Sequence, residues 1–255
     1  MIDIHCHILP GVDDGAGNLE ESLALARGAV AEGIKTIIAT PHHKNGHYIN
    51  KKEDIVAATA KLNGALKEEN IPLTVLPGQE PRIYGEIIDD YRKGEILTLN
   101  DDGKYLFVEL PSDHVPYYTE QLLFEIQLAG LVPIIVHPER NRDFLERPEL
   151  LYQLVKKGAL TQVTAASLAG FFGKKIKKFS LQMVEANLTH FVASDAHNMV
   201  NRTFKMNDAY EVLEKEFGFD AVYLFQENAD LLLEGKRVFR DEPVRMRKKK
   251  LFGIF

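Results

Sequence analysis

The first fifteen residues bring together two histidines in a pattern that can bind a metal. Residues Met1 to Ile4 alternate apolar and polar side chains as a short strand would, and His5 and His7 follow with one residue between them. Side chains two apart on a strand point to the same face, so both imidazoles can reach one point. Neutral imidazole is the commonest protein metal ligand. The stretch predicts the beginning of a metal site, although such a pair can also merely end a strand.

Carboxylates follow these histidines on a turn that is flexible enough to fold back toward them. The turn contains Asp13, Asp14 and Gly15. Further residues of ligand type occur later, at or near the ends of apolar runs. They are His42, Glu80, Glu109, His137, Asp195 and His197. Together with His5, His7 and Asp14 they give nine candidate metal ligands, of which five are imidazoles and four are carboxylates.

The size and chemistry of this set restrict the metal. One ion takes roughly four to six ligands, so the set suits two or three divalent ions. Mixed imidazole and carboxylate ligation favours Mn, Fe or Zn over Ca, and a structural zinc site would favour cysteine. A single member could have a purely structural role, because Glu109 could be a paired core carboxylate and Asp195 a helix N-cap. Nine such residues at matching positions are better accounted for by a metal site.

Strand and helix patterns alternate along the chain and must position these ligands. Strands are predicted at residues 1–4, 35–41, 73–80, 105–110, 132–138, 160–165 and 190–197. Helices are predicted at residues 19–33, 51–69, 83–94, 117–129 and 148–157, within 174–187, at 203–217 and through 228–235. Asn18 is a plausible N-cap of the first helix, and Gly33 is its stop signal.

Such alternation predicts parallel strands joined by crossover helices, with a site at the carboxyl ends of the strands. Six of the seven predicted strands deliver a histidine, aspartate or glutamate to that edge. An open sheet seldom gathers residues from so many strands at one point, whereas a closed barrel does. The fold class is therefore predicted to be α/β, as one closed barrel.

Composition excludes several classes of protein. The chain has 255 residues, 45% of them hydrophobic, and a net charge of -6 argues against nucleic acid as the main partner. Its one cysteine, Cys6, allows no internal disulfide, so we expect a reducing cytoplasm. The first strand leaves no room for a signal peptide, and no apolar run approaches the ~18 residues of a membrane span. We expect one domain over residues 1–240 and a basic, apolar tail over 241–255.

The ordered series of motifs resembles the polymerase-and-histidinol-phosphatase (PHP) superfamily. Within it, the segments HILPGVDDG and HPERN resemble the manganese-dependent bacterial protein-tyrosine phosphatases of the CpsB/YwqE type, which are associated with capsule and exopolysaccharide synthesis. The matching motifs are His5-Cys6-His7-Ile8-Leu9-Pro10 with Asp13-Asp14-Gly15, Ala39-Thr40-Pro41-His42, Gly78-Gln79-Glu80, Val108-Glu109, His137-Pro138-Glu139-Arg140 and Ser194-Asp195-Ala196-His197.

This resemblance implies a distorted TIM-like (β/α)7 barrel and a three-metal site made by the nine residues named above. The choice of Asp14 over Asp13, and of His42 over His43, rests on the family position alone. The resemblance also implies a hydrolase that removes phosphate from phosphotyrosine in proteins.

Clustered divalent ions lower the pKa of a water to give a hydroxide nucleophile at neutral pH, and they hold phosphoryl oxygens for in-line displacement. The transferring phosphoryl also calls for guanidinium groups. Arg140 and Arg202 follow His137 and His197 in predicted loops from which they could reach it. Either could instead be an ordinary surface cation, and the resemblance supports the phosphate role for both.

A thiol-dependent phosphatase is an alternative that the sequence disfavours. Such enzymes need an arginine six residues after the nucleophilic cysteine, and here that position is Val12. Cys6 also alternates to the strand face opposite His5 and His7, so we expect it to be packed in the interior.

The remaining candidates are weaker. Solvent-exposed or structural roles are favoured for His43, His47, His114 and His190, although the loop residues among them could border a substrate. Tyr117 and Tyr118 could either stack on an aromatic substrate or pack the following helix. The end of the chain carries Arg245, Arg247, Lys248, Lys249 and Lys250, followed by Leu251, Phe252, Ile254 and Phe255. This tail could dock a partner or lie near an anionic membrane, and a solvated tail is an equal alternative.

Three functions remain open. The leading one is a phosphatase acting on phosphotyrosine, with the tyrosine-rich tail of a cognate bacterial tyrosine kinase as the expected substrate. The second is a small-molecule phosphoesterase of the histidinol-phosphatase kind. The third is a metal-binding protein that regulates the kinase by contact alone.

Overall fold

The computed structural model describes residues 1–246, in which strands alternate with helices as predicted. The strands are β1 Ile2–Cys6, β2 Thr36–Ala39, β3 His42–His43, β4 Thr74–Pro77, β5 Glu80–Pro81, β6 Tyr105–Val108, β7 Val132–Val136, β8 Leu160–Thr164 and β9 Phe191–Ala193. All seven predicted strands are present. The third is interrupted before Glu80, which makes β5 a separate two-residue strand, and the second ends at Ala39 and is followed by the two-residue strand β3, beyond its predicted end at residue 41.

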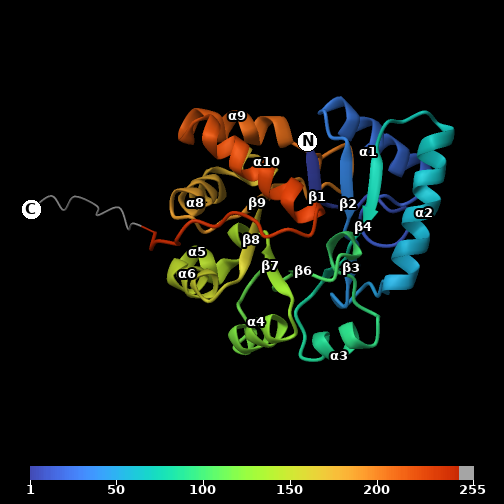
Figure 1. Ribbon diagram of the computed structural model, residues 1–255. Coiled ribbons are helices and arrows are strands. Elements are labelled where there is room, and N and C mark those ends of the chain that lie inside the picture. The colour runs from blue at the N-terminus through green and yellow to red at the C-terminus, as the bar shows by residue number, and fades with distance from the viewer. Residues whose placement is uncertain (247–255) are drawn as a thin grey trace, which may run out of the picture.

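The helices surround the strands in Figure 1. They are α1 Leu19–Ala31, α2 Lys52–Glu68, α3 Ile87–Arg92, α4 Thr119–Leu128, α5 Arg142–Glu146, α6 Pro148–Lys156, α7 Ala165–Ala169, α8 Lys174–Glu185, α9 Met206–Phe217 and α10 Phe219–Leu233, with 3-10 turns η1 Leu99–Asp101 and η2 Pro138–Arg140. Asn18 caps α1 through Glu21 N–H, as predicted. The five-residue helices α5 and α7 were not predicted, because they are too short to show a periodic apolar face. The last helix is also longer than predicted, since it begins at Phe219, directly after Gly218.

Every strand pair in the described chain is parallel, which confirms the predicted class of crossover topology. The strands form three sheets, in the orders β1-β2-β4, β3-β5 and β6-β7-β8-β9. Single bridges join these sheets, from Cys6 to Ala196 and from Arg82 to Glu109. Hydrogen-bonded ladders therefore do not run continuously around the strands, and the links between sheets lie next to candidate ligands.

The innermost apolar cluster supports the ends of the strands from below. It includes Ile4, Phe107, Ile134 and Phe191, all fully buried, and Leu232 of α10 packs against them. The ring of Phe107 lies 5.0 Å from the ring of His5, centroid to centroid. Burying a side chain of this size contributes about 1.5–3 kcal/mol, so the floor beneath His5 is rigidly packed.

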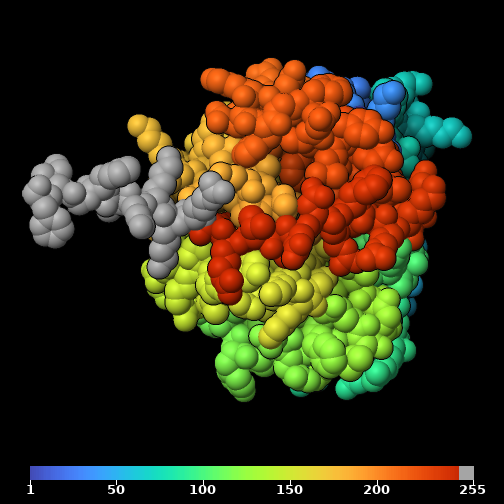
Figure 2. All heavy atoms as spheres, turned by 60° about the vertical axis from the view of Figure 1, so that its left-hand side comes forward, coloured from blue at the N-terminus to red at the C-terminus, as the bar shows by residue number. Residues whose placement is uncertain are grey.

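The segment after α10 runs across the surface, as Figure 2 shows in red. Val244 N–H donates to Ala186 at the end of α8, and Arg245 pairs with Glu149 of α6 at 3.0 Å. The first part of the predicted tail is therefore packed on the body of the protein. The tail residues Arg247, Lys248, Lys249, Lys250, Leu251, Phe252, Ile254 and Phe255 lie outside the described residues. Through residue 246, no helix combines the length and the apolar character needed to cross a membrane.

His190 lies just before β9, at the opposite strand end from the candidate ligands, and gives a prediction about stability. Thr161 N–H donates to its Nδ1, so that nitrogen must be unprotonated. Burial, with a smaller effect of Arg240, lowers the pKa of His190 to about 3. The unfolded chain therefore binds a proton at His190 more readily than the native chain does. The contribution of neutral His190 to the free energy of unfolding is complete above pH 6.5 and is lost as the pH falls from 6.5 toward 3.

We expect the free energy of unfolding to fall by about 2 kcal/mol between pH 7 and pH 5 because of His190. A glutamine can still accept the Thr161 hydrogen bond but does not titrate, so His190→Gln should lack this loss. Urea unfolding of both proteins at the two pH values, with the same metal content, measures it. Identical pH dependence in the two proteins would contradict the assignment.

Candidate metal centre

The structure brings the nine predicted ligands to the carboxyl ends of the strands. They come from β1, β3 and β5 and from the segments that follow β1, β6, β7 and β9. Glu80 lies at the centre of the cluster, within 3.4 Å of His5, His7, His42 and His137 nitrogens. Seven of the nine are buried, His137 is partly buried, with 11% of its side chain accessible, and Asp14 is exposed, with 45% of its side chain accessible.

Three groups within this cluster have ligand atoms that all lie within 4.8 Å of one another. The first contains His7, Asp14, His42 and His197, the second His5, His7 and Glu80, and the third His42, Glu80 and Glu109. Because neighbouring groups share His7, His42 or Glu80, they lie side by side. Asp195 lies 3.5 Å from His5 and 3.4 Å from His7, and could complete the second group.

Several of these atoms lack a hydrogen-bond partner among the described residues although they are buried. They include His42 Nδ1, Glu80 Oε2 and His197 Nε2. His42 Nδ1 lies only 2.8 Å from Glu80 Oε2, yet the pair lacks hydrogen-bond geometry. Buried polar groups are normally satisfied, so ligand atoms within these groups that lack a hydrogen-bond partner fit coordination of cations. The residues present therefore fit the predicted metals.

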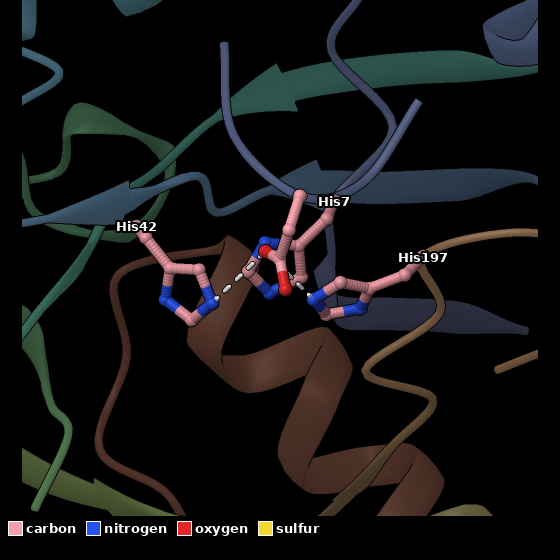
Figure 3. A group of neighbouring side chains, drawn as sticks. His7, His42 and His197 are labelled. Carbon is pink, nitrogen blue, oxygen red and sulfur yellow. Dashed lines mark ion pairs between the residues drawn. The ribbon is translucent and has the colours of Figure 1, made fainter. Parts of the chain in front are cut away.

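Figure 3 shows the first group. The Asp14 carboxylate lies 3.3 Å from a nitrogen of His42 and 3.4 Å from a nitrogen of His197. The dashed lines in Figure 3 mark ion pairs of these two labelled histidines. The His7 ring lies close to that of His197 and is tilted against it by 30°, with centroids 3.7 Å apart. One carboxylate and three imidazoles thus converge from three separate segments.

Electrostatics within the cluster are dominated by mutual charge and burial. Burial alone would lower the pKa of His42, but Glu80 and Asp14 raise it to about 10. Burial, together with the nearby Glu80 charge, raises the pKa of Glu109 to about 7. Burial also lowers the pKa of His137 to about 4, with help from Arg140. The pKa values of neighbouring groups are thus shifted in opposite directions, as is typical of functional sites. The crowded carboxylates are stabilised by positive charge next to them.

Three hydrogen bonds orient the imidazoles so that Nε2 faces the centre. His7 Nδ1 donates to Asp13 at 2.6 Å, and His5 Nδ1 donates to Gln162 at 2.9 Å. His197 Nδ1 donates to the Asp195 carbonyl at 2.9 Å. Such partners fix ring orientation and raise the basicity of ligating histidines. Gln162 was missed because β8 carries no residue of ligand type.

The turn that carries Asp13 and Asp14 is pressed against His7. A Cβ atom on Gly15 would lie 2.1 Å from the His7 carbonyl oxygen, so only glycine fits. Two candidate ligands also have left-handed backbone, with φ of 36° at His137 and 53° at Asp195. Non-glycine residues in this region cluster at functional sites, which agrees with their placement here.

Both predicted arginines reach the cluster through Asp195. Arg140 lies 2.7 Å and Arg202 3.1 Å from Asp195 Oδ2, and Arg202 also lies 3.5 Å from Asp14. Arg82 was not predicted, and its Nε donates to Glu109 at 2.9 Å. It follows Glu80 by two residues, so the two-residue strand period could have placed it on the same face as Glu80.

The expectation for Cys6 is confirmed. Its side chain is fully buried, with Sγ 3.5 Å from the Ala196 carbonyl, and burial raises the pKa of the thiol well above its usual value. A thiol in this environment is neither accessible nor ionised, so it is not a nucleophile.

The weaker candidates divide by burial. His43 is buried and bonded through Nδ1 to the Asn50 carbonyl at 2.7 Å, which is a structural role. Tyr118 donates its hydroxyl to the Ile83 carbonyl. His47, His114 and Tyr117 are exposed.

The fold and the site together define a class of protein. The strands are parallel, buried imidazoles and carboxylates lie at their ends, and arginines flank them, so the chain belongs to the class of metal-binding α/β proteins. A model of the family described as "Capsular polysaccharide synthesis, CpsB/CapC" matches residues 1–234, and the chain belongs to this family.

Named relatives agree with this membership. The chain is 56% identical to tyrosine-protein phosphatase YwqE of Bacillus subtilis, over 100% of both chains. It is 34% identical to tyrosine-protein phosphatase CpsB of Streptococcus pneumoniae, over 86% of this chain and 91% of that one. It also matches a solved structure from work on YwqE and CpsB, described as metal-dependent tyrosine phosphatases. That match has a TM-score of 0.95 and 56% identity, and covers 97% of this chain and 100% of the other.

Proposed function

We propose that the protein is a metal-dependent protein-tyrosine phosphatase that hydrolyses phosphotyrosine. The observation that carries this proposal is the cluster of three ligand groups with buried, unbonded His42, Glu80 and His197 atoms beside two arginines. Metals and guanidinium groups are the two components that phosphoryl transfer to water needs. The names of the relatives supply the substrate class.

The nine predicted ligands would hold two or three divalent ions, Mn first, with Fe or Zn as alternatives. When bound, the ions would lower the pKa of a water and neutralise charge on the phosphoryl group. Because Asp195 lies between Arg140 and Arg202, it holds both guanidinium groups in place at the edge of the cluster. Each arginine keeps further N–H groups that can bind phosphoryl oxygens as negative charge develops there.

We extend the proposal to the barrel, the domain bounds, the natural substrate and the site of action. We take the three sheets as one distorted TIM-like (β/α)7 barrel of the PHP type, because the bridges at Cys6 and Arg82 join their edges. Residues 1–240 would be one domain and 241–255 a tail. The natural substrate would be the tyrosine-rich tail of a bacterial tyrosine kinase that controls capsule or exopolysaccharide synthesis. A single buried thiol suits a cytoplasmic site of action.

A substrate panel tests this function. We expect phosphotyrosine peptides, and flexible protein tails that carry phosphotyrosine, to be hydrolysed with similar kcat/KM. Phosphoserine peptides should be poor substrates, since their shorter side chain holds the backbone nearer the exposed loop residues such as Tyr117. A preference for histidinol phosphate would favour the small-molecule phosphoesterase. Kinase binding without any hydrolysis, retained in a ligand-deleted variant, would favour the non-catalytic regulator.

A further inference from the structure

A cavity of about 330 Å³ opens beside two of the candidate ligands, Glu109 and His137. It lies where β6 and β7 end, and its wall continues into η2 and α5. The side chains that matter for its chemistry are Arg82, Arg140, Ser112, Asn141, Leu110 and Phe144. It therefore combines two cations with apolar carbon atoms.

The two guanidinium groups of this cavity each pair with a single carboxylate among the described residues. Arg82 Nε donates to Glu109 at 2.9 Å, and Arg140 pairs through one terminal nitrogen with Asp195 at 2.7 Å. Within residues 1–246 these carboxylates are the only hydrogen-bond or ion-pair partners of the two groups. Both side chains stay partly accessible, at 28% and 23%. Each thus has spare N–H donors while its position is fixed, which is the arrangement that binds a bidentate anion.

We infer that this cavity receives the phosphotyrosyl side chain of the substrate and that Arg82 is a positioning residue for its phosphate. This inference rests on the proposed function. Spare Arg82 and Arg140 donors suit phosphoryl oxygens, and buried carbon atoms of Leu110 and Phe144 line the wall that an aromatic ring would meet. The cavity volume is near the lower end of the roughly 300–1,000 Å³ of small-molecule pockets. The cavity can therefore take one side chain of a substrate protein and not a larger part of its surface.

The assignment also accounts for selection of tyrosine. A phosphoserine whose phosphate reached the same cluster would leave the apolar part of the cavity unfilled, because it has no ring. It would lose the burial of apolar surface that a phenyl group gains. Selection would then come from the wall of the cavity and not from the metals, which treat all phosphate monoesters alike.

A tryptophan at the mouth of the cavity tests the site without touching the candidate ligands. Ser112 is exposed and lines the cavity, whereas its neighbour Asp113 is exposed and does not line it. We expect Ser112→Trp to weaken binding of a labelled peptide with a non-hydrolysable phosphotyrosine analogue by about ten-fold or more, read by fluorescence anisotropy. Asp113→Trp should bind it like the wild type. Metal content and inhibition by inorganic phosphate should be unchanged in both.

Substitution of Arg82 tests the positioning role separately. We expect Arg82→Leu to raise KM for phosphotyrosine peptides and the inhibition constant of inorganic phosphate by about ten-fold, with smaller changes in kcat. Arg82→Lys should restore part of both, because it keeps the charge but not the fork. The matched control is Arg92→Leu, an exposed arginine on α3. Metal analysis of every variant separates this role from simple support of Glu109.

The possible failures are distinguishable. If the wild type binds and hydrolyses phosphotyrosine peptides but Ser112→Trp does so equally well, the cavity is not the seat of the side chain. If Arg82→Leu loses as much metal as Glu109→Ala, Arg82 supports a ligand and does not position substrate. If the metal-loaded wild type hydrolyses no phosphotyrosine peptide, the proposed function itself fails.

Discussion

Chelation of divalent ions is expected to abolish phosphotyrosine hydrolysis, and Cys6→Ser is expected to leave most of it intact. Chelation removes the group that activates water, which should lower kcat by about a hundred-fold or more, and added Mn should restore it. Cys6 faces away from the cluster, and its protonated, fully buried thiol has no access to substrate. A serine hydroxyl can still donate to the Ala196 carbonyl that Sγ approaches.

The decisive measurement is the turnover of a phosphotyrosine peptide together with the metal content of the same samples. Val12→Ala is a suitable control, since Val12 lies where a thiol phosphatase would carry its arginine. Loss of turnover in Cys6→Ser at unchanged metal content would disprove the metal mechanism and revive the thiol alternative.

The approximate position of the site could be predicted because the parallel topology largely determines where the ligands lie. Once strands alternate with helices, residues at strand ends must meet at one edge, which places His42 beside Glu80 and Arg82 beside Glu109. The pairing register then turns distant sequence positions into neighbours. His5 was predictable in the same way, from the two-residue period of the first strand.

What could not be predicted depends on packing between distant segments. The sequence does not distinguish Asp13 from Asp14, yet the structure gives them different roles. Asp13 holds His7 Nδ1, while Asp14 faces His42 and His197. Gln162 is likewise an ordinary polar residue in a strand until that strand is placed beside His5. The short helices α5 and α7 form because of local packing and have no periodic pattern of their own.

Ligand and phosphate-binding roles should separate when His137→Ala and Arg140→Ala are compared. His137 Nε2 lies 3.0 Å from Glu80, so its removal takes an imidazole out of the cluster and should reduce bound metal. Arg140→Ala should keep the metals, because Asp195 retains Arg202 at 3.1 Å. It should still lower kcat/KM by about a hundred-fold and weaken inhibition by free phosphate, as expected for loss of a donor to the transferring group.

His42→Ala extends the comparison, because His42 belongs to two of the three ligand groups whereas His137 belongs to none of them. Loss of a shared ligand weakens two ion positions at once, so His42→Ala should retain less metal than His137→Ala, and Arg140→Ala should retain the most. Metal analysis of the three variants, purified side by side without added metal and again after loading with Mn, gives this order directly. Equal metal loss in all three would mean that Arg140 supports the cluster structurally, through Asp195, and that the phosphate is held by other groups.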